Sequence, residues 1–254
     1  MAVITENMRF NADALDNLVI GVATRIGRHD SGMHYHKKHQ LLCAASGSMS
    51  INLDGIWCVL PPARAVWIPA GTKHCAVMRN VVDYRSLYFD VDESPLFPTE
   101  IKIISVNLLL RELIERMAYW EWEKPIEEQR STFALFCEEL MLSEEEHFSL
   151  KLPTDRRLTQ WLGKVMGGEL VPELLADMAQ NIGASAKTVS RIFSRETGMP
   201  YQAWRQQWRL QASIEYLSKG TSVSDVAMFL GFSSDSAFIS FFRKMTGHTP
   251  GRYL

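Results

Sequence analysis

The sequence predicts an α+β protein of two domains, in which an antiparallel β-barrel is followed by a helical linker pair and an all-α C-terminal domain. Two observations predict this class: strand-forming segments fill residues 18–91, and helical periodicity begins at residue 105. Of the 254 residues, 46% are hydrophobic and 22% charged, which excludes disordered and collagen-like classes. Because no apolar run could span a membrane and no export signal is visible, we expect a cytoplasmic protein.

The barrel is expected within residues 1–104. Segments rich in β-branched, aromatic and aliphatic residues occupy 18–26, 41–45, 49–53, 56–60, 65–68, 75–78 and 84–91. Turn residues separate them, and Asp54-Gly55 favours a tight hairpin, because both central residues of a type I′ turn need positive φ. No helical period interrupts these segments, so they predict an antiparallel sandwich or barrel.

Two helices are expected next, at 105–120 and 126–141, joined through Lys124-Pro125. Residues 105–150 form a helical linker, and we expect a homodimer through the 105–141 helices. Leu109, Leu113 and Met117 lie at four-residue intervals and would supply its apolar stripe. The alternative is that this stripe packs only against its own barrel.

Residues 151–254 are expected to be helical and contain an internal repeat. The first copy has Ala179, Gly183, Ser185, Val189, Phe193, Thr197-Gly198 and Pro200; the second has Ala227, Gly231, Ser234, Phe238, Phe242, Thr246-Gly247 and Pro250. Each copy reads as a helix, a glycine turn, a serine cap and a second helix ended by Thr-Gly, which is a helix-turn-helix. One such copy would also fit an ordinary bundle, but two matching copies favour the helix-turn-helix.

Charge divides the chain in the same way. Residues 1–150 hold 14 Lys and Arg against 21 Asp and Glu, a net charge of −7, and residues 151–254 hold 13 against 8, a net charge of +5. The basic half is the one expected to bind double-stranded DNA.

In a helix-turn-helix, the exposed residues of the second helix face the major groove. Arg191 can form a bidentate pair with guanine, Ala237 can contact a thymine methyl group, and Arg243 and Lys244 can bind phosphates. The helix between the copies would hold the two reading helices about one DNA turn apart, on the order of 34 Å. The predicted DNA-binding residues are Ser185, Lys187, Thr188, Ser190, Arg191, Arg195, Ser234, Asp235, Ser236, Ala237, Ser240, Arg243 and Lys244.

The stretch from Ser185 to Pro250 closely resembles the signature of the AraC/XylS family of transcriptional regulators. The resemblance is clearest in residues 231–238 and 242–250, and it covers about the last hundred residues. It implies a domain that binds promoter DNA. Ser240 stands where some members carry a basic residue, which leaves a base contact at that position open.

A histidine cluster marks the N-terminal half. His34, His36 and Gln40, with His74 farther along, resemble the two cupin motifs, in which three histidines and a carboxylate bind a divalent metal. Gln40 stands in the carboxylate position, and a neutral amide is a poorer ligand for a dication. We therefore expect no cofactor and a small-molecule effector site lined by His34, His36, Gln40, Trp57, Trp67 and His74, with a metal held by His34, His36 and His74 as the alternative.

These observations predict an effector-responsive transcriptional regulator of the AraC/XylS type and not an enzyme. A rival hypothesis is a metal-dependent cupin enzyme with a helical appendage, which would need a firmly held metal and an open coordination position. A DNA-architecture protein without effector control would leave more than half of the chain without a role.

Overall fold

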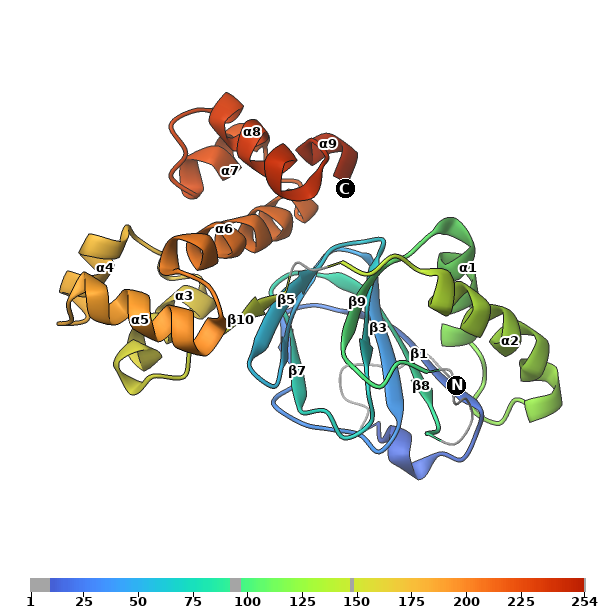
Figure 1. The fold of residues 1–254 in the computed structure, drawn as a ribbon. Coiled ribbons are helices and arrows are strands. Elements are labelled where there is room, and N and C mark those ends of the chain that lie inside the picture. The colour runs from blue at the N-terminus through green and yellow to red at the C-terminus, as the bar shows by residue number, and fades with distance from the viewer. Residues whose placement is uncertain (1–9, 92–96, 147–148, 254) are drawn as a thin grey trace. The chain divides into compact units, whose positions relative to one another are not determined.

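The computed structural model describes residues 10–91, 97–146 and 149–253. The chain divides into two compact units, one formed by residues 1–54 and 59–147 and the other by residues 55–58 and 148–253 (Figure 1). Two predicted features, the β-rich N-terminal domain and the helical C-terminal domain, are confirmed.

The strands form two antiparallel sheets of five strands each, ordered β1-β8-β3-β6-β9 and β10-β5-β4-β7-β2. Each of the seven predicted strand segments is a strand, and the short strands β2, β9 and β10 were not predicted. The strands are β1 Val19–Ile26, β2 His29–Asp30, β3 His39–Ser46, β4 Met49–Leu53, β5 Ile56–Leu60, β6 Arg64–Ile68, β7 His74–Met78, β8 Val82–Phe89, β9 Lys102–Ser105 and β10 Leu150–Lys151. As predicted for the tight hairpin between β4 and β5, Asp54 and Gly55 have φ values of 50° and 85°.

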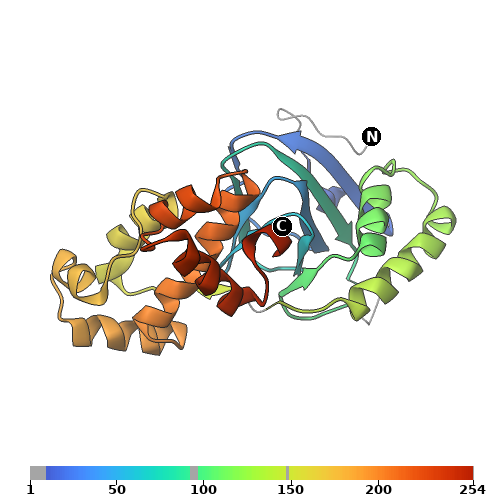
Figure 2. The same cartoon turned by 90° about the horizontal axis from the view of Figure 1, so that it is seen from above.

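Helices α1 (Leu108–Ala118) and α2 (Ile126–Leu142) lie side by side against the sheet that contains β1 and β8 (Figures 1 and 2). Helix α1 begins at Leu108 instead of Ser105, because Ser105 belongs to β9 and the Asn107 side chain caps the helix by accepting from the Leu110 N–H at 2.8 Å. Helix packing is close at Gly21 of β1, where an added Cβ would lie 2.0 Å from the Met117 carbonyl oxygen.

The predicted dimer stripe is wrong for two of its three residues, because they belong to the apolar core under these helices. Leu113 and Met117 are buried in one cluster with Trp67 and Phe89 of the sheet, so they pack against their own domain. Of the three stripe residues, only Leu109 is exposed. A four-residue period shows that a helix face is buried, but the same period arises whether the face meets the helix's own sheet or a partner.

The second unit contains seven α-helices within the described residues: α3 Thr159–Gly167, α4 Leu175–Asn181, α5 Ala186–Thr197, α6 Tyr201–Ser218, α7 Val223–Phe229, α8 Asp235–Thr246 and α9 Pro250–Tyr253. Its first half packs Phe193 of α5 against Tyr201 and Trp204 of α6, with ring centroids 4.9 and 5.2 Å apart. Its second half buries Phe238 and Phe242 of α8. In the part of the chain that the structure describes, no helix is long and apolar enough to cross a membrane.

Candidate DNA-reading helices and effector cavity

The two predicted helix-turn-helix units have matching atomic details. The Ser185 hydroxyl accepts from the Thr188 N–H at 3.1 Å at the start of α5, and the Ser234 hydroxyl accepts from the Ala237 N–H at 3.2 Å at the start of α8. The turn glycines Gly183 and Gly231 both have positive φ, 66° and 69°. The repeat is therefore structural as well as sequential.

The second helix of each unit ends in the same way. Gly198 and Gly247 have φ values of 78° and terminate α5 and α8. The threonine directly before each glycine donates its hydroxyl to a phenylalanine carbonyl one turn earlier, Thr197 to Phe193 at 2.7 Å and Thr246 to Phe242 at 2.9 Å. The buried phenylalanines fix which face of each helix remains outside.

The outer face of α5 is cationic. Lys187 and Arg191 are exposed, and no hydrogen bond or ion pair is recorded for either side chain among the described residues. Arg195, the third cation on this helix, is exposed but paired, with its guanidinium 2.5 Å from Glu196 and 3.7 Å from Asp155. Free cations on an exposed helix face suit guanine edges and phosphates, so Lys187 and Arg191 are better placed to bind DNA than Arg195.

The outer face of α8 carries short side chains. Ser234, Asp235, Ser236 and Ser240 are exposed and Ala237 is half-buried, while Arg243 and Lys244 lie exposed in its last turn. The Asp235 carboxylate already accepts a hydrogen bond from Ser224 at 2.5 Å. At the start of α5, the hydroxyls of the capping Ser185 and of Thr188 are hydrogen-bonded to each other at 2.9 Å, and Ser190 of α5 is half-buried. The two helices thus present different chemistry on the same framework.

Helix α6 connects the first helix-turn-helix to the second (Figure 1). Its buried Arg209 donates from Nε to the Leu230 carbonyl at 3.0 Å and lies 3.8 Å over the Phe232 ring. Burial lowers the pKa of this guanidinium to about 10, which still leaves it charged at neutral pH. Arg209 therefore ties α6 to the turn of the second helix-turn-helix.

The N-terminal compact unit, formed by residues 1–54 and 59–147, contains a cavity of about 130 Å³. It is lined by Phe10, Val22, Thr24, Ile26, His29, Ser31, His34, Gln40, Leu42, His74, Ala76, Met78, Tyr84 and Tyr88. An apolar cavity of about 150 Å³ is large enough to hold benzene, so this one suits a small molecule. Sequence reasoning missed Tyr84 and Tyr88, although alternate positions on one strand, Tyr84, Ser86 and Tyr88, place them on one face.

The polar end of this cavity is buried. The Gln40 amide donates to the Ser86 hydroxyl at 2.8 Å and to the Tyr88 hydroxyl at 3.1 Å. The Gln40 carbonyl oxygen is buried and has no hydrogen-bond partner among the described residues. Burial raises the pKa of Tyr84 and of Tyr88, so both phenols stay protonated and can donate.

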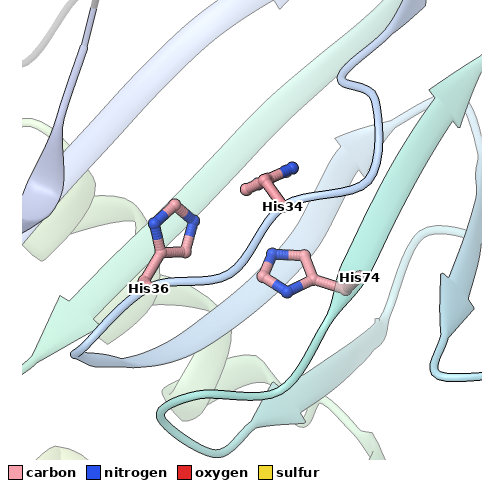
Figure 3. Close-up of side chains that lie close together, drawn as sticks. All are labelled: His34, His36 and His74. Atoms are coloured by element: carbon pink, nitrogen blue, oxygen red, sulfur yellow. The ribbon is translucent and has the colours of Figure 1, made fainter.

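His34, His36 and His74 come together beside the cavity, and Figure 3 shows their rings around a shared space. The ring centroids are 4.5 to 5.3 Å apart. Burial, with a smaller contribution from His74 and His34, lowers the pKa of His36 to about 4, and burial also lowers the pKa of His74. Both imidazoles are therefore neutral at neutral pH.

Trp67 and Trp57, which sequence reasoning assigned to this site, lie elsewhere. Trp67 pairs with Leu41 in the register of β3 and β6, one residue out of phase with Gln40, so it faces the opposite side of the sheet and stacks on His39. Trp57 lies in the part of β5 that pairs with β10 in the second unit. Neither tryptophan lines the cavity. The sequence-based prediction misplaced them because residue composition alone does not fix which face of a sheet a strand residue occupies.

Comparisons with known proteins identify both units. The model of the AraC-like ligand binding domain matches residues 18–144, and that of a helix-turn-helix domain matches residues 178–254. The HTH-type transcriptional regulator NimR of Escherichia coli is 28% identical over 225 residues, which cover 88% of this chain and 82% of that protein.

Two further proteins are similar over most of the chain. The HTH-type transcriptional activator RhaS of Shigella sonnei is 23% identical and covers 92% of this chain and 91% of its own length. The solved structure of fatty acid-bound ToxT from Vibrio cholerae aligns with a TM-score of 0.38 at 11% identity, over 97% of this chain and 96% of that one. The family-model matches and the two capped helix-turn-helix units agree: this chain belongs to the AraC family of transcriptional regulators and consists of a ligand-binding domain followed by a DNA-binding domain.

Proposed function

We propose that a small molecule binds in the cavity of the first unit and changes how strongly the chain binds promoter DNA through α5 and α8. The observation that carries this proposal is an apolar cavity with two protonated tyrosines and a buried acceptor on Gln40 that has no partner among the described residues. Ligand sites of this kind combine apolar walls with a few fixed polar groups. The role is regulatory and not catalytic, in line with the relatives named as transcriptional regulators.

On the DNA side, α5 supplies the specific contacts. Lys187 and Arg191 reach base edges or phosphates, and the shorter side chains of α8 add shape-dependent contacts, with Arg243 and Lys244 on phosphates. An effector can shift this binding only if it has different affinity for the DNA-binding and non-binding arrangements of the protein.

A homodimer through the exposed apolar side chains of α1 and α2 completes the proposal. Leu108 and Leu142 are 72% and 70% exposed. They lie at neighbouring ends of the two helices, because Asn107 donates to Glu139 across them at 2.8 Å. Leu109 and Met141, also exposed, extend the same patch. Exposed apolar patches of this kind typically mark interfaces.

The effector proposal is tested by filling the cavity. Genomic fragments bound by the full chain are selected first, and gel-shift titrations then identify metabolite fractions that change the affinity. Ala76→Phe places a ring in the cavity and is expected to abolish the response while effector-free DNA binding persists. The control Ala45→Phe adds the same ring at an exposed site. A full response in Ala76→Phe would remove the effector from this cavity.

The dimer proposal has a separate test. The double variant Leu108→Glu and Leu142→Glu is expected to convert a dimer into a monomer in sedimentation experiments, with an unchanged circular dichroism spectrum. Arg111→Glu, at an exposed position of α1, is the control. A dimer that survives the double substitution would place the interface elsewhere.

A further inference from the structure

Three histidines beside the cavity are held in fixed relation by the backbone. The His34 N–H donates to the His74 carbonyl at 2.9 Å, and the His74 N–H donates to the His34 carbonyl at 2.8 Å. The His36 carbonyl accepts from the Gly71 N–H at 2.7 Å, two residues after Pro69. One ring nitrogen from each histidine lies within 4.8 Å of the others. The cluster is therefore built by paired segments and does not depend on chance surface proximity.

The hydrogen bonds of two rings fix their tautomers. Nδ1 of His34 is 2.8 Å from the Gly32 carbonyl oxygen, and Nδ1 of His74 is 2.9 Å from the Thr72 carbonyl oxygen. A carbonyl only accepts, so each Nδ1 carries a proton, and Nε2 is the nitrogen of each ring that can offer a lone pair to a metal. Metal-binding histidines are typically oriented in this way, by donating the second ring N–H to a carbonyl or carboxylate.

The Nε2 atoms of two of the rings are left unpaired within the described part of the chain. Nε2 of His74 and Nε2 of His36 are buried and have no hydrogen-bond partner among the described residues. Buried polar atoms are normally paired, so two buried nitrogens in one cluster without a partner among the described residues indicate a bound group. A single group that accepts a lone pair from a ring nitrogen of each of the three histidines is a cation.

We propose that His34, His36 and His74 bind one divalent first-row transition metal, with Zn²⁺ as the best match, and that its remaining coordination position opens into the cavity. Imidazole nitrogen suits Zn²⁺, Cu²⁺ or Ni²⁺, whereas Mg²⁺ and Ca²⁺ require oxygen ligands. Three protein ligands with a fourth position left open is the arrangement of zinc sites that bind exogenous molecules.

The geometry needs a modest contraction. Four-coordinate zinc with bonds of about 2.0–2.1 Å places its ligand nitrogens roughly 3.4 Å apart, against the present limit of 4.8 Å. His74 is only 2% exposed, whereas His34 and His36 are half-buried, so these two rings have room to move toward His74.

The open position gives the cavity a second kind of anchor. His34 and His74 line the cavity together with Gln40, so a molecule bound there could place an anionic donor on the metal. This part of the inference rests on the proposed effector function, whereas metal binding by the three histidines does not.

The test uses the untagged full chain after chelator treatment and dialysis. Co²⁺, a spectroscopic substitute for Zn²⁺, is expected to bind one ion per chain with the intense visible absorption of a four- or five-coordinate site. Zn²⁺ should displace it, and azide, a small anionic ligand, should shift the spectrum by occupying the open position. A spectrum like that of hydrated Co²⁺ would overturn the site, and indifference to azide would overturn the open position.

Variants assign the ligands. His34→Ala and His36→Ala are each expected to weaken Zn²⁺ binding at least tenfold while melting like the metal-free wild type, because both rings are only half-buried. His248→Ala removes an exposed histidine of the other unit and should bind as the wild type does. Equal affinity in all three variants would show adventitious binding and refute the assignment.

Gel shifts separate this inference from the proposed function. A chain that binds no metal but still responds to an effector on DNA would refute the metal site and leave the effector proposal intact. Tight metal binding lost in His34→Ala, with no effector response in any condition, would do the reverse.

Discussion

Replacing Arg191 by alanine tests the reading role of α5 with little cost to the fold. The side chain is exposed, and no hydrogen bond or ion pair is recorded for it among the described residues, so the free energy of unfolding should stay within about 0.5 kcal/mol of the wild type. A bidentate contact to guanine contributes about 1–3 kcal/mol. Arg191→Ala should therefore weaken binding to a selected operator by roughly 5- to 150-fold at 25 °C.

The assay is a gel-shift or anisotropy titration on the operator and on random DNA at one fixed salt concentration. Arg195→Ala is the matched control, because its guanidinium is already paired with Glu196 and Asp155 and should cost less binding. Arg130→Ala, on α2 in the other unit, controls for the loss of one positive charge. An equal loss on operator and random DNA would make Arg191 a phosphate contact, and no loss on either would remove it from the interface.

Two further predictions concern packing. Gly21→Ala should lower the melting temperature and the free energy of unfolding by about 1–3 kcal/mol, because the new Cβ would lie 2.0 Å from the Met117 carbonyl oxygen. The control Gly163→Ala, in α3, has open space around the new Cβ and should be neutral or stabilising. If Gly163→Ala were the more destabilising of the two, the packing of α1 on the sheet would be contradicted. Arg209→Met should lower the free energy of unfolding in urea by about 2–3 kcal/mol and weaken operator binding, because the buried Leu230 carbonyl loses its donor. Wild-type stability in this variant would show that the contact is dispensable.

Local signals predicted much of the fold. The Asp54-Gly55 turn and the serine caps at Ser185 and Ser234 depend on a few neighbouring residues, and the structure places each as expected. The repeated spacing of small, turn and capping residues indicated two helix-turn-helix units, because both copies solve the same packing problem with the same residue types.

Tertiary choices were harder to predict. The period of Leu113 and Met117 indicated a buried helix face but not that it meets its own sheet. Trp67 has the aromatic surface of a ligand site, yet its register with Leu41 places it on the opposite side of the sheet from Gln40. The strand register decides this, and register depends on pairing partners that are distant in sequence.

The sequence predicted the histidine cluster but not the backbone groups that orient its rings. The spacing of His34 and His36 and their likeness to a known motif indicated a shared site with His74, and the structure brings the three rings together. The carbonyls that orient His34 and His74 belong to Gly32 and Thr72, whose roles depend on local backbone geometry. No spacing rule in side-chain types reveals such partners.

The proposed function requires that α5 and α8 of the helical unit both contact DNA. Hydroxyl-radical footprinting of the full chain on a selected operator tests it most directly. The prediction is two protected backbone segments per chain beside successive major grooves, about 10 base pairs apart, with the protection of one of them weakened in Arg191→Ala. A single protected segment, or protection that does not depend on sequence, would contradict it.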